Sequence, residues 1–201
     1  YAGDAYPELS IHRGRLHMLL YQALIERTGM GTVETGWTAT GFENAGGAVL
    51  LHLCSASGET RTERGTLLIG ADGIHSAIRR QMVPDEGEPV WGGAVLWRGT
   101  SQARPFLTGA SMVMVGYAGL RFVSYPISRP DPATGLATIN WIANLNYPPG
   151  SPWNKEDWNR EATLADFLPR FEGFRFPWLD VPALVRQAAT VFEYPMVDRD
   201  P

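Results

Sequence analysis

The sequence has few features that would cross-link the chain, insert it in a membrane or attract it to nucleic acid. Only one of its 201 residues is a cysteine, Cys54, so no internal disulfide can form, and we predict a reducing, cytoplasmic location. No run of about 18 apolar residues occurs, which predicts the absence of a membrane span. The 17 Lys and Arg residues are outnumbered by 21 Asp and Glu, so we expect no bulk attraction for nucleic acid.

The common signatures of hydrolytic and metal-dependent enzymes are also missing. The 4 histidines lack the spacing of a metal-binding helix, and neither Gly-x-Ser-x-Gly nor a Gly-x4-Gly-Lys-Ser/Thr loop occurs. Cys54 falls within an expected strand, which favours a core thiol over a nucleophile. Aromatic residues, in contrast, are plentiful, with 7 Trp, 7 Tyr and 8 Phe. Such residues fill cores, and they also line pockets for flat ligands.

Periodicity and turn residues predict a chain of alternating helices and strands that changes character after Pro84. Before Pro84 the expected elements are a helix at 15–27, a short strand at 32–35, hairpin strands at 37–43 and 48–53, a strand at 64–69 and a helix at 76–82. After it we expect strands at 94–98, 111–115, 121–125, 138–145 and 190–194, and short helices at 153–160, 164–171 and 181–188. The second set predicts a mixed or antiparallel sheet.

The sharpest local feature is the segment 70–79, Gly-Ala-Asp-Gly-Ile-His-Ser-Ala-Ile-Arg. The strand before it would deliver Asp72 to the sheet edge where open α/β sheets bind ligands. Gly70 and Gly73 let a bulky ligand approach the backbone, and the start of the next helix favours phosphate. Arg79 would then bind phosphate or structure the turn. The alternative is an ordinary corner in which Ser76 caps the helix and no ligand binds.

Two other segments place charge where a helix begins or a strand ends. Arg13, within Ile-His-Arg-Gly-Arg-Leu at 11–16, can hold a phosphate oxygen in the fixed fork of its guanidinium. The alternative is that Arg13 and Arg15 are simply solvated at a helix start. The segment 192–201, Phe-Glu-Tyr-Pro-Met-Val-Asp-Arg-Asp-Pro, is an apolar strand that ends in alternating charges.

Together these segments resemble the class A flavoprotein monooxygenases, the single-component family of para-hydroxybenzoate-hydroxylase-like enzymes. The resemblance is carried by Gly-Ala-Asp-Gly-x-x-Ser-Ala-x-Arg at 70–79, His-Arg-x-x-Leu at 12–16 and Tyr-Pro-Met-Val-Asp-Arg-Asp-Pro at 194–201. Further similar stretches are Leu-Trp-Arg-Gly at 96–99, Tyr-Pro-Ile-Ser at 125–128 and Asp-Trp-Asn-Arg at 157–160. The nearest branch includes phenazine-carboxylate hydroxylases, and the resemblance spans nearly the whole chain.

The resemblance implies an α/β (α+β) fold in two parts. Residues 1–84 would form a partial three-layer domain for FAD and NAD(P), 85–195 a β-sheet substrate domain with helices, and 196–201 the return to the first domain. The family's Gly-x-Gly-x-x-Gly and Gly-Asp-Ala-Ala-His segments do not occur in the 201 residues. The chain also starts without Met and stops after a strand-like run, so we expect a fragment that is inactive alone. Its open sheet edge would allow a homo-oligomer.

The resemblance also implies an activity and the residues that serve it. The parent enzyme would use FAD, with NAD(P)H and O2 as co-substrates, to hydroxylate an aromatic, phenazine-like substrate. The implied cofactor contacts are Arg13, Gly70, Asp72, Gly73 and Arg79. The substrate-facing candidates are Trp97, Tyr125, Trp141 and Tyr194, with core packing as the alternative for each. Strand alternation puts Trp97 and Arg98 on opposite faces of the sheet.

Two other functions stay open at this point. One is a non-catalytic module that binds flat aromatic ligands on its β-sheet. The other is a different FAD oxidoreductase of the same fold, such as a halogenase or a reductase, although no Trp-x-Trp-x-Ile-Pro stretch of the halogenase kind occurs. No side chain is assigned a catalytic role, because in such enzymes the cofactor carries the difficult chemistry.

Overall fold

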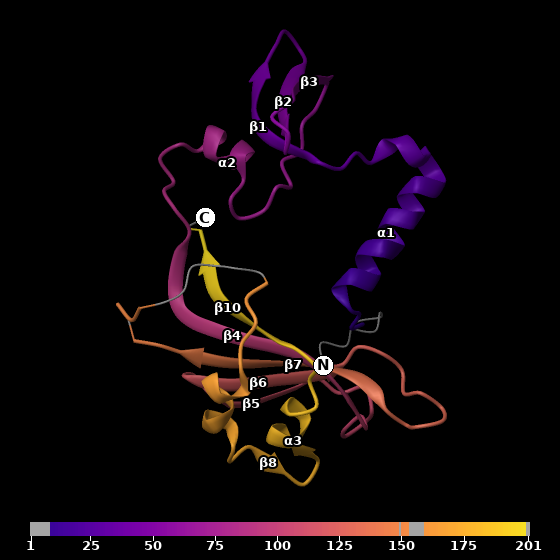
Figure 1. Cartoon of the computed structure of the whole chain (residues 1–201), viewed down its shortest axis with the longest axis vertical. Coiled ribbons are helices and arrows are strands. Elements are labelled where there is room, and N and C mark those ends of the chain that lie inside the picture. Colours follow the sequence, from indigo (N-terminus) through magenta and orange to yellow (C-terminus); the bar gives the residue numbers. More distant parts are fainter. Residues whose placement is uncertain (1–8, 149, 153–158, 200–201) are drawn as a thin grey trace, which may run out of the picture. The chain divides into compact units, whose positions relative to one another are not determined.

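A computed structural model describes residues 9–148, 150–152 and 159–199, which divide between two compact units. The sheet unit comprises Tyr1–Leu19 and Trp91–Met196, and the hairpin unit comprises Leu20–Val90 and Val197–Pro201. Each unit combines helical segments with antiparallel strands, as Figure 1 shows by element and by colour along the sequence. The predicted α+β class is therefore confirmed.

The hairpin unit is built on a three-stranded antiparallel sheet. Its strands, in spatial order, are β1 (Trp37–Asn44), β2 (Val49–Ser55) and β3 (Thr60–Gly65). The turn between the first two is closed by backbone hydrogen bonds between Ala45 and Ala48, and Gly46 and Gly47 have φ of 54° and 81°. Glycine adopts positive φ without a steric penalty, so the predicted hairpin forms where the sequence places it.

Of the other predicted strands of this unit, the one at 32–35 is wrong and the one at 64–69 is confirmed only as far as Gly65. The segment 33–35 has no regular structure and follows the 3-10 helix η1 (Met30–Thr32), and β3 ends at Gly65 rather than at residue 69. A strand needs a hydrogen-bonded neighbour, and no described strand pairs with residues 33–35 or 66–69. The side chains of Leu67 and Ile69 are accordingly 75% and 77% exposed.

Both helices predicted before Pro84 are present. Helix α1 (Arg13–Thr28) ends at Gly29, whose φ is 89°, and it leaves most of its apolar side chains exposed. Helix α2 (Ala77–Met82) begins directly after Ser76, whose hydroxyl accepts a hydrogen bond from the Arg79 N–H at 2.9 Å. Ser76 is therefore the helix N-cap, as the sequence predicts.

The sheet unit is organised by a five-stranded sheet in the order β10-β4-β7-β6-β5. The strands are β4 (Val90–Ala103), β5 (Val113–Tyr117), β6 (Leu120–Pro126), β7 (Ala137–Asn146) and β10 (Val191–Asp198). The pairs β4–β7, β6–β7 and β5–β6 are antiparallel. All five strands predicted after Pro84 are confirmed, and β4 is longer at both ends than expected.

Short segments from 164–185 cover one face of this sheet. They are η2 (Leu164–Asp166), η3 (Leu168–Phe171), β8 (Arg175–Phe176), β9 (Leu179–Asp180) and α3 (Val181–Val185). The helix predicted at 164–171 is two 3-10 turns, because Pro169 lacks the N–H that a continuous helix requires. The helix predicted at 181–188 ends at Val185, and the one predicted at 153–160 falls mainly on 153–158, outside the described residues.

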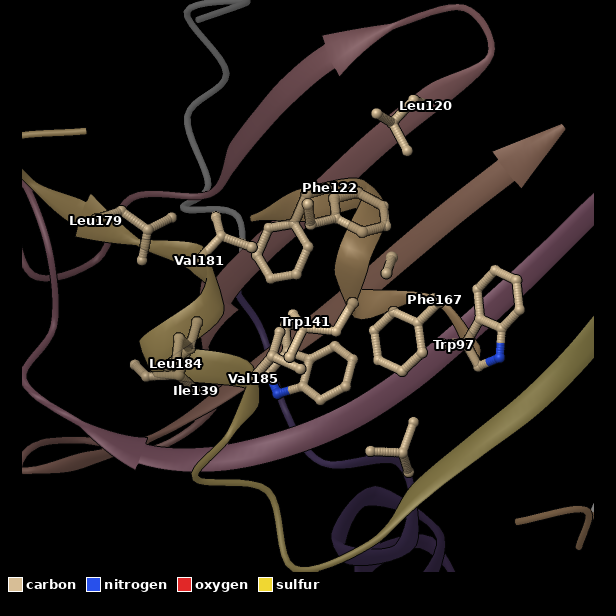
Figure 2. Packing of buried hydrophobic residues seen from close by; sticks show 14 of the residues in the cluster. Trp97, Leu120, Phe122, Ile139, Trp141, Phe167, Leu179, Val181, Leu184 and Val185 are labelled. Atoms are coloured by element: carbon tan, nitrogen blue, oxygen red, sulfur yellow. The ribbon is translucent and has the colours of Figure 1, made fainter. Parts of the chain in front are cut away.

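The core of the sheet unit is an aromatic layer between the sheet and this cover. The Trp97 ring stacks on Phe167 with centroids 5.2 Å apart, and Trp141 stacks on the same ring at 6.0 Å (Figure 2). The Trp141 Nε1–H donates to the Ser101 hydroxyl at 3.0 Å, and that hydroxyl donates to the Leu184 carbonyl at 2.6 Å. The indole is thus buried with its one polar atom satisfied.

Candidate cofactor and substrate sites

Asp72 lies in an exposed turn that its own carboxylate helps to close. The carboxylate accepts hydrogen bonds from the Ser76 hydroxyl and from the N–H groups of Ala77 and Ile78, the last two at 2.8 and 3.3 Å. Gly73 has a φ of 82° and open space where a side chain would stand, whereas a Cβ on Gly70 would lie 3.0 Å from Ile78. Gly73 is therefore required by backbone conformation, and Gly70 by the close approach of α2.

These hydrogen bonds fix the charge of Asp72. Partial removal from water raises the pKa of this carboxyl, but the bonds from the Ser76 hydroxyl and from the Ile78 and Ala77 N–H groups outweigh it, so its pKa lies below the ordinary value. Asp72 is therefore ionised at neutral pH. The same bonds occupy the first free N–H groups of α2, so the carboxylate rather than the helix end is the group left to meet a ligand.

Asp72 is one of the residues that line a groove in the hairpin unit. The groove has a volume of about 500 Å³, and its wall includes Trp37 and Ala39 of β1, Leu51 and Leu53 of β2 and Arg61 of β3. The Arg61 guanidinium lies over the Trp37 ring, 4.5 Å from its centroid. A groove of this size can admit part of a dinucleotide.

Arg79 is bound to an acidic partner rather than pointing into the groove. Its Nε donates to both carboxylate oxygens of Glu86 at 2.7 and 2.9 Å. Arg199 reaches the same carboxylate at 3.1 Å and also donates to the carbonyls of Ile74 and Gly87 at 2.8 and 2.7 Å. The hydrogen bond from Arg79 is the main cause that holds the pKa of Glu86 below its ordinary value. We call these three side chains the Arg–Glu–Arg cluster.

Sequence reasoning missed Glu86 and Arg199. The signal available was the run of alternating charges after β10, which we interpreted only as a charged strand end. Arg199 nevertheless binds the carbonyl of Ile74, directly after the Asp72 turn and 125 positions away in sequence. The Arg–Glu–Arg cluster therefore attaches the end of the described chain to the turn.

The four aromatic candidates of the sheet unit lie on two different faces. Trp97 and Trp141 are 2% and 0% exposed and belong to the aromatic core. Tyr125 and Tyr194 are half-buried and lie on the other face, because each is the neighbour of a residue that points inward. The segments at 164–185 cover one side of the sheet, and we call the other side the open face. It is the face on which Tyr125, Tyr194 and Arg98 lie.

A cavity of about 320 Å³ lies on the open face. It is lined by His12, Arg98, Gly99, Thr100, Asn140, Ala189, Thr190 and Phe192. The Arg98 guanidinium lies over the Tyr194 ring, 5.0 Å from the centroid, and Asn140 pairs with Thr100 on one side and Tyr125 on the other. Neutral polar groups, aromatic rings and one guanidinium thus surround this cavity.

The surroundings of Arg98 lower the pKa of its guanidinium. Burial is the main cause that lowers its pKa from the ordinary value, and the positive charge of Arg13 lowers it further, against smaller opposing effects of Tyr194 and Tyr125. Arg13 is exposed in the first turn of α1 and belongs to the sheet unit, whereas Gly70, Asp72, Gly73 and Arg79 belong to the hairpin unit. The structure therefore groups Arg13 with the open face, and the other four cofactor candidates with the Asp72 turn.

Among the residues that the structure describes, no three His, Cys, Asp or Glu side chains gather in a way that could hold a metal ion. No helix within the described ranges has the length and apolar character needed to cross a membrane.

Sequence comparison finds one relative that matches this chain from end to end and others that match most of it. This chain is 38% identical over 203 residues to the phenazine 1,6-dicarboxylic acid hydroxylase PhzS of Lysobacter antibioticus. The aligned region covers 100% of this chain and 50% of that protein. The chain spans about half the length of the curated relatives it matches. No family model matches the sequence.

Solved structures share the fold at lower identity. A salicylate hydroxylase in complex with its substrate superposes with a TM-score of 0.64 at 20% identity, over 92% of this chain and 46% of that one. HpxO of Klebsiella pneumoniae, complexed with FAD and uric acid, gives 0.62 at 22% identity, over 90% and 43%. These structures show that the fold is shared, and the sequence match over the whole of this chain confirms the predicted resemblance to flavin-dependent aromatic hydroxylases.

Proposed function

We propose that this chain, a section of a class A flavin-dependent monooxygenase by sequence and fold, serves the hydroxylation of an aromatic ring by FAD, NAD(P)H and O2. The observation that supports this most is the 38% identity with a phenazine hydroxylase over the whole chain. The proposed substrate is a phenazine-like or other flat aromatic acid. We further propose that residues 1–84 and 196–201 contribute to the cofactor domain and 85–195 to the substrate domain. A cytoplasmic location and a homo-oligomer formed through a sheet edge stay predictions.

The Asp72 turn fits the dinucleotide part of FAD. An ionised, exposed carboxylate that lines a groove can accept hydrogen bonds from ribose hydroxyls, and the space beside Gly73 lets a ligand approach the backbone. Arg13 lies in the sheet unit, and its role as a phosphate contact stays a separate prediction. The two other FAD segments of the family do not occur in these residues, so we propose that this chain supplies only part of the cofactor site.

The protein's own contribution would be binding, orientation and the exclusion of water. When bound, FAD supplies the redox chemistry. Asp72 would hold the ribose, and the Arg–Glu–Arg cluster would keep the Asp72 turn in place through the Arg199 bond to the Ile74 carbonyl. Tyr125 and Tyr194 would contact the substrate ring on the open face. Trp97 and Trp141 would act from beneath, by fixing the strands that carry these groups.

The test is the purified protein encoded by the complete reading frame that contains this chain. We expect stoichiometric bound flavin, oxidation of NADH or NADPH that an aromatic acid stimulates, and a product that gains one oxygen atom by mass spectrometry. Comparison of the two nucleotides identifies the reductant. Aromatic binding detected by Trp fluorescence, without flavin and without nucleotide oxidation, would instead identify a non-catalytic binding module.

Asp72→Asn tests the cofactor role directly. The amide keeps one oxygen acceptor but loses the charge, so we expect FAD to bind about 10- to 100-fold more weakly, the effect of one charge-assisted hydrogen bond. Flavin fluorescence during titration of the apoprotein measures this. Asp131→Asn is the matched control, because that carboxylate also accepts backbone N–H bonds in an exposed turn, but in the sheet unit. Equal affinity of the two variants would exclude Asp72 from the cofactor site.

A further inference from the structure

Arg98 is a half-buried cation for which the described residues supply no counter-ion. Its Nε is buried without a hydrogen-bond partner, and the guanidinium forms no ion pair within the described part of the chain. Water lost from a guanidinium must be replaced by hydrogen-bond acceptors, or the burial is costly. The ring of Tyr194 compensates only in part, since a cation–π contact offers no lone pair.

The residues around Arg98 make the binding of an anion beside it more favourable. The positive charge of Arg13 lowers the pKa of Arg98, so the two cations repel each other. Thr100 and Asn140 in the cavity wall are neutral, and Asn140 and Thr100 lie opposite each other in the β4–β7 register. An oxyanion placed in this cavity would be attracted by two cations and would meet no carboxylate among its lining residues.

The shape of the site indicates what carries the anion. A cavity of about 320 Å³ is at the lower end of the range for small-molecule pockets. Phe192 lines it and Tyr194 lies under the guanidinium, so rings and charge are adjacent. A planar guanidinium binds a carboxylate through two parallel N–H bonds, and aromatic walls favour a flat ring.

We infer that Arg98 binds the carboxylate of a planar aromatic acid on the open face and thereby selects acids over neutral ligands of the same shape. The inference rests on the proposed function and adds the anionic group of the substrate and the residue that recognises it. Arg98 is in this sense a specificity residue. A phosphate of the cofactor has the same oxyanion chemistry, so the experiment has a separate arm for FAD.

The test compares two ligands that differ only in charge, phenazine-1-carboxylate and phenazine-1-carboxamide, on the complete protein. Dissociation constants come from quenching of Trp fluorescence or from calorimetry, which need no turnover. The variants are Arg98→Met, which removes the charge, and Arg98→Lys, which keeps the charge but loses the fork. Arg170→Met is the matched control, because Arg170 is an exposed arginine of η3, in the cover of the opposite face.

In Arg98→Met we expect the carboxylate to bind about 10- to 100-fold more weakly and the carboxamide to change by less than about threefold. Arg98→Lys should lie between wild type and Arg98→Met, and Arg170→Met should match wild type for both ligands. FAD affinity should be the same in all four proteins. Arg98→Lys also keeps the test informative where Arg98→Met folds poorly, because circular dichroism then identifies the folded variant to compare.

Three outcomes would overturn the inference: equal weakening of both ligands, no weakening of either, or a loss of FAD affinity with the preference for the acid intact. The proposed function fails separately. A protein that discriminates acid from amide through Arg98 but oxidises no NAD(P)H would refute the monooxygenase and leave the carboxylate site standing. Hydroxylation of an aromatic acid that is indifferent to Arg98 would do the reverse.

Discussion

The sheet unit and the hairpin unit are stabilised by different forces. Among the described residues, nearly all buried hydrophobic side chains belong to the sheet unit, and the hairpin unit has only Val49 and Ile78. The hairpin unit relies instead on polar contacts, namely the bonds of Asp72 to α2, the Arg–Glu–Arg cluster and the pairing of the Gln81 amide with the backbone of Phe42.

Because different forces stabilise the two units, their candidate sites are also held in place in different ways. In the sheet unit, dry packing decides which side chains are left on the open face, so the site depends on volume and complementarity. In the hairpin unit, hydrogen bonds and charges hold a turn in the open, so the site depends on ionisation. The two units should therefore respond to different perturbations, and four predictions test this, from the largest expected effect to the smallest.

Trp141→Ala should destabilise the sheet unit most. It empties the centre of the aromatic core and leaves the Ser101 hydroxyl without its donor, and such substitutions cost about 3–5 kcal/mol. Chemical denaturation followed by far-UV circular dichroism measures the loss. Met114→Ala, on an exposed position of β5, is the control and should cost little. Similar losses in the two variants would contradict the distinction between core and open face.

Gly99→Ala should break the same core with a single added methyl group. A Cβ at Gly99 would lie 2.3 Å from the Trp141 ring, so the indole or the strand must move, at about 1–3 kcal/mol. Gly92→Ala is a close control, because Gly92 lies in the same strand with no atom within 4 Å of its added Cβ. Thermal melting should rank the two variants clearly, and equal melting temperatures would refute the packing argument.

Ser76→Ala should weaken the hairpin unit by about 1 kcal/mol, the usual cost of a lost N-cap. The hydroxyl accepts from the Arg79 N–H and donates to Asp72, so its removal loosens α2 and the turn together. Amide hydrogen exchange should show faster exchange in α2 and no change in β7. Protection lost equally in both places would mean that the two units do not respond separately.

Acid below a pH of about 4 should loosen the hairpin unit before the sheet unit, where the described carboxyl with a lowered pKa, Asp131, accepts hydrogen bonds only within its own exposed turn. The pKa values of Asp72 and Glu86 are lower in the folded protein than their ordinary values. The stabilisation they give is therefore present above a pH of about 4 and is lost as the pH falls through the lower folded pKa values. An acid titration followed by NMR should show this order, and Glu86→Gln should make the loss less steep. Earlier loss of the sheet unit would contradict it.

The sequence predicts local structure well where the pattern and the turns agree. The hairpin at Gly46 and Gly47, the Ser76 cap and the five strands of the sheet unit all follow from side-chain period and turn residues. The strand predicted over 64–69 is wrong beyond Gly65, since a strand also depends on a neighbour that local sequence does not reveal.

The candidate site shows the same limit. Alternation correctly separates Trp97 from Arg98, but the cover at 164–185 decides which of the two faces is buried. Arg199 could not be connected to the Asp72 turn from sequence, because the contact spans 125 positions and depends on the folded path of the chain. The assignment of individual residues to cofactor and substrate stays a prediction.

The adjacent residues Trp97 and Arg98 allow β4 to pair with β7 in only one register. A slip of one residue would send the guanidinium into the stack with Phe167 and turn the indole out toward the cavity. Both changes are unfavourable. The two side chains that separate the core face from the ligand face therefore also destabilise any shifted register of the sheet. An insertion of one residue within β4 should accordingly abolish folding and ligand binding together, whereas one in an exposed loop should not.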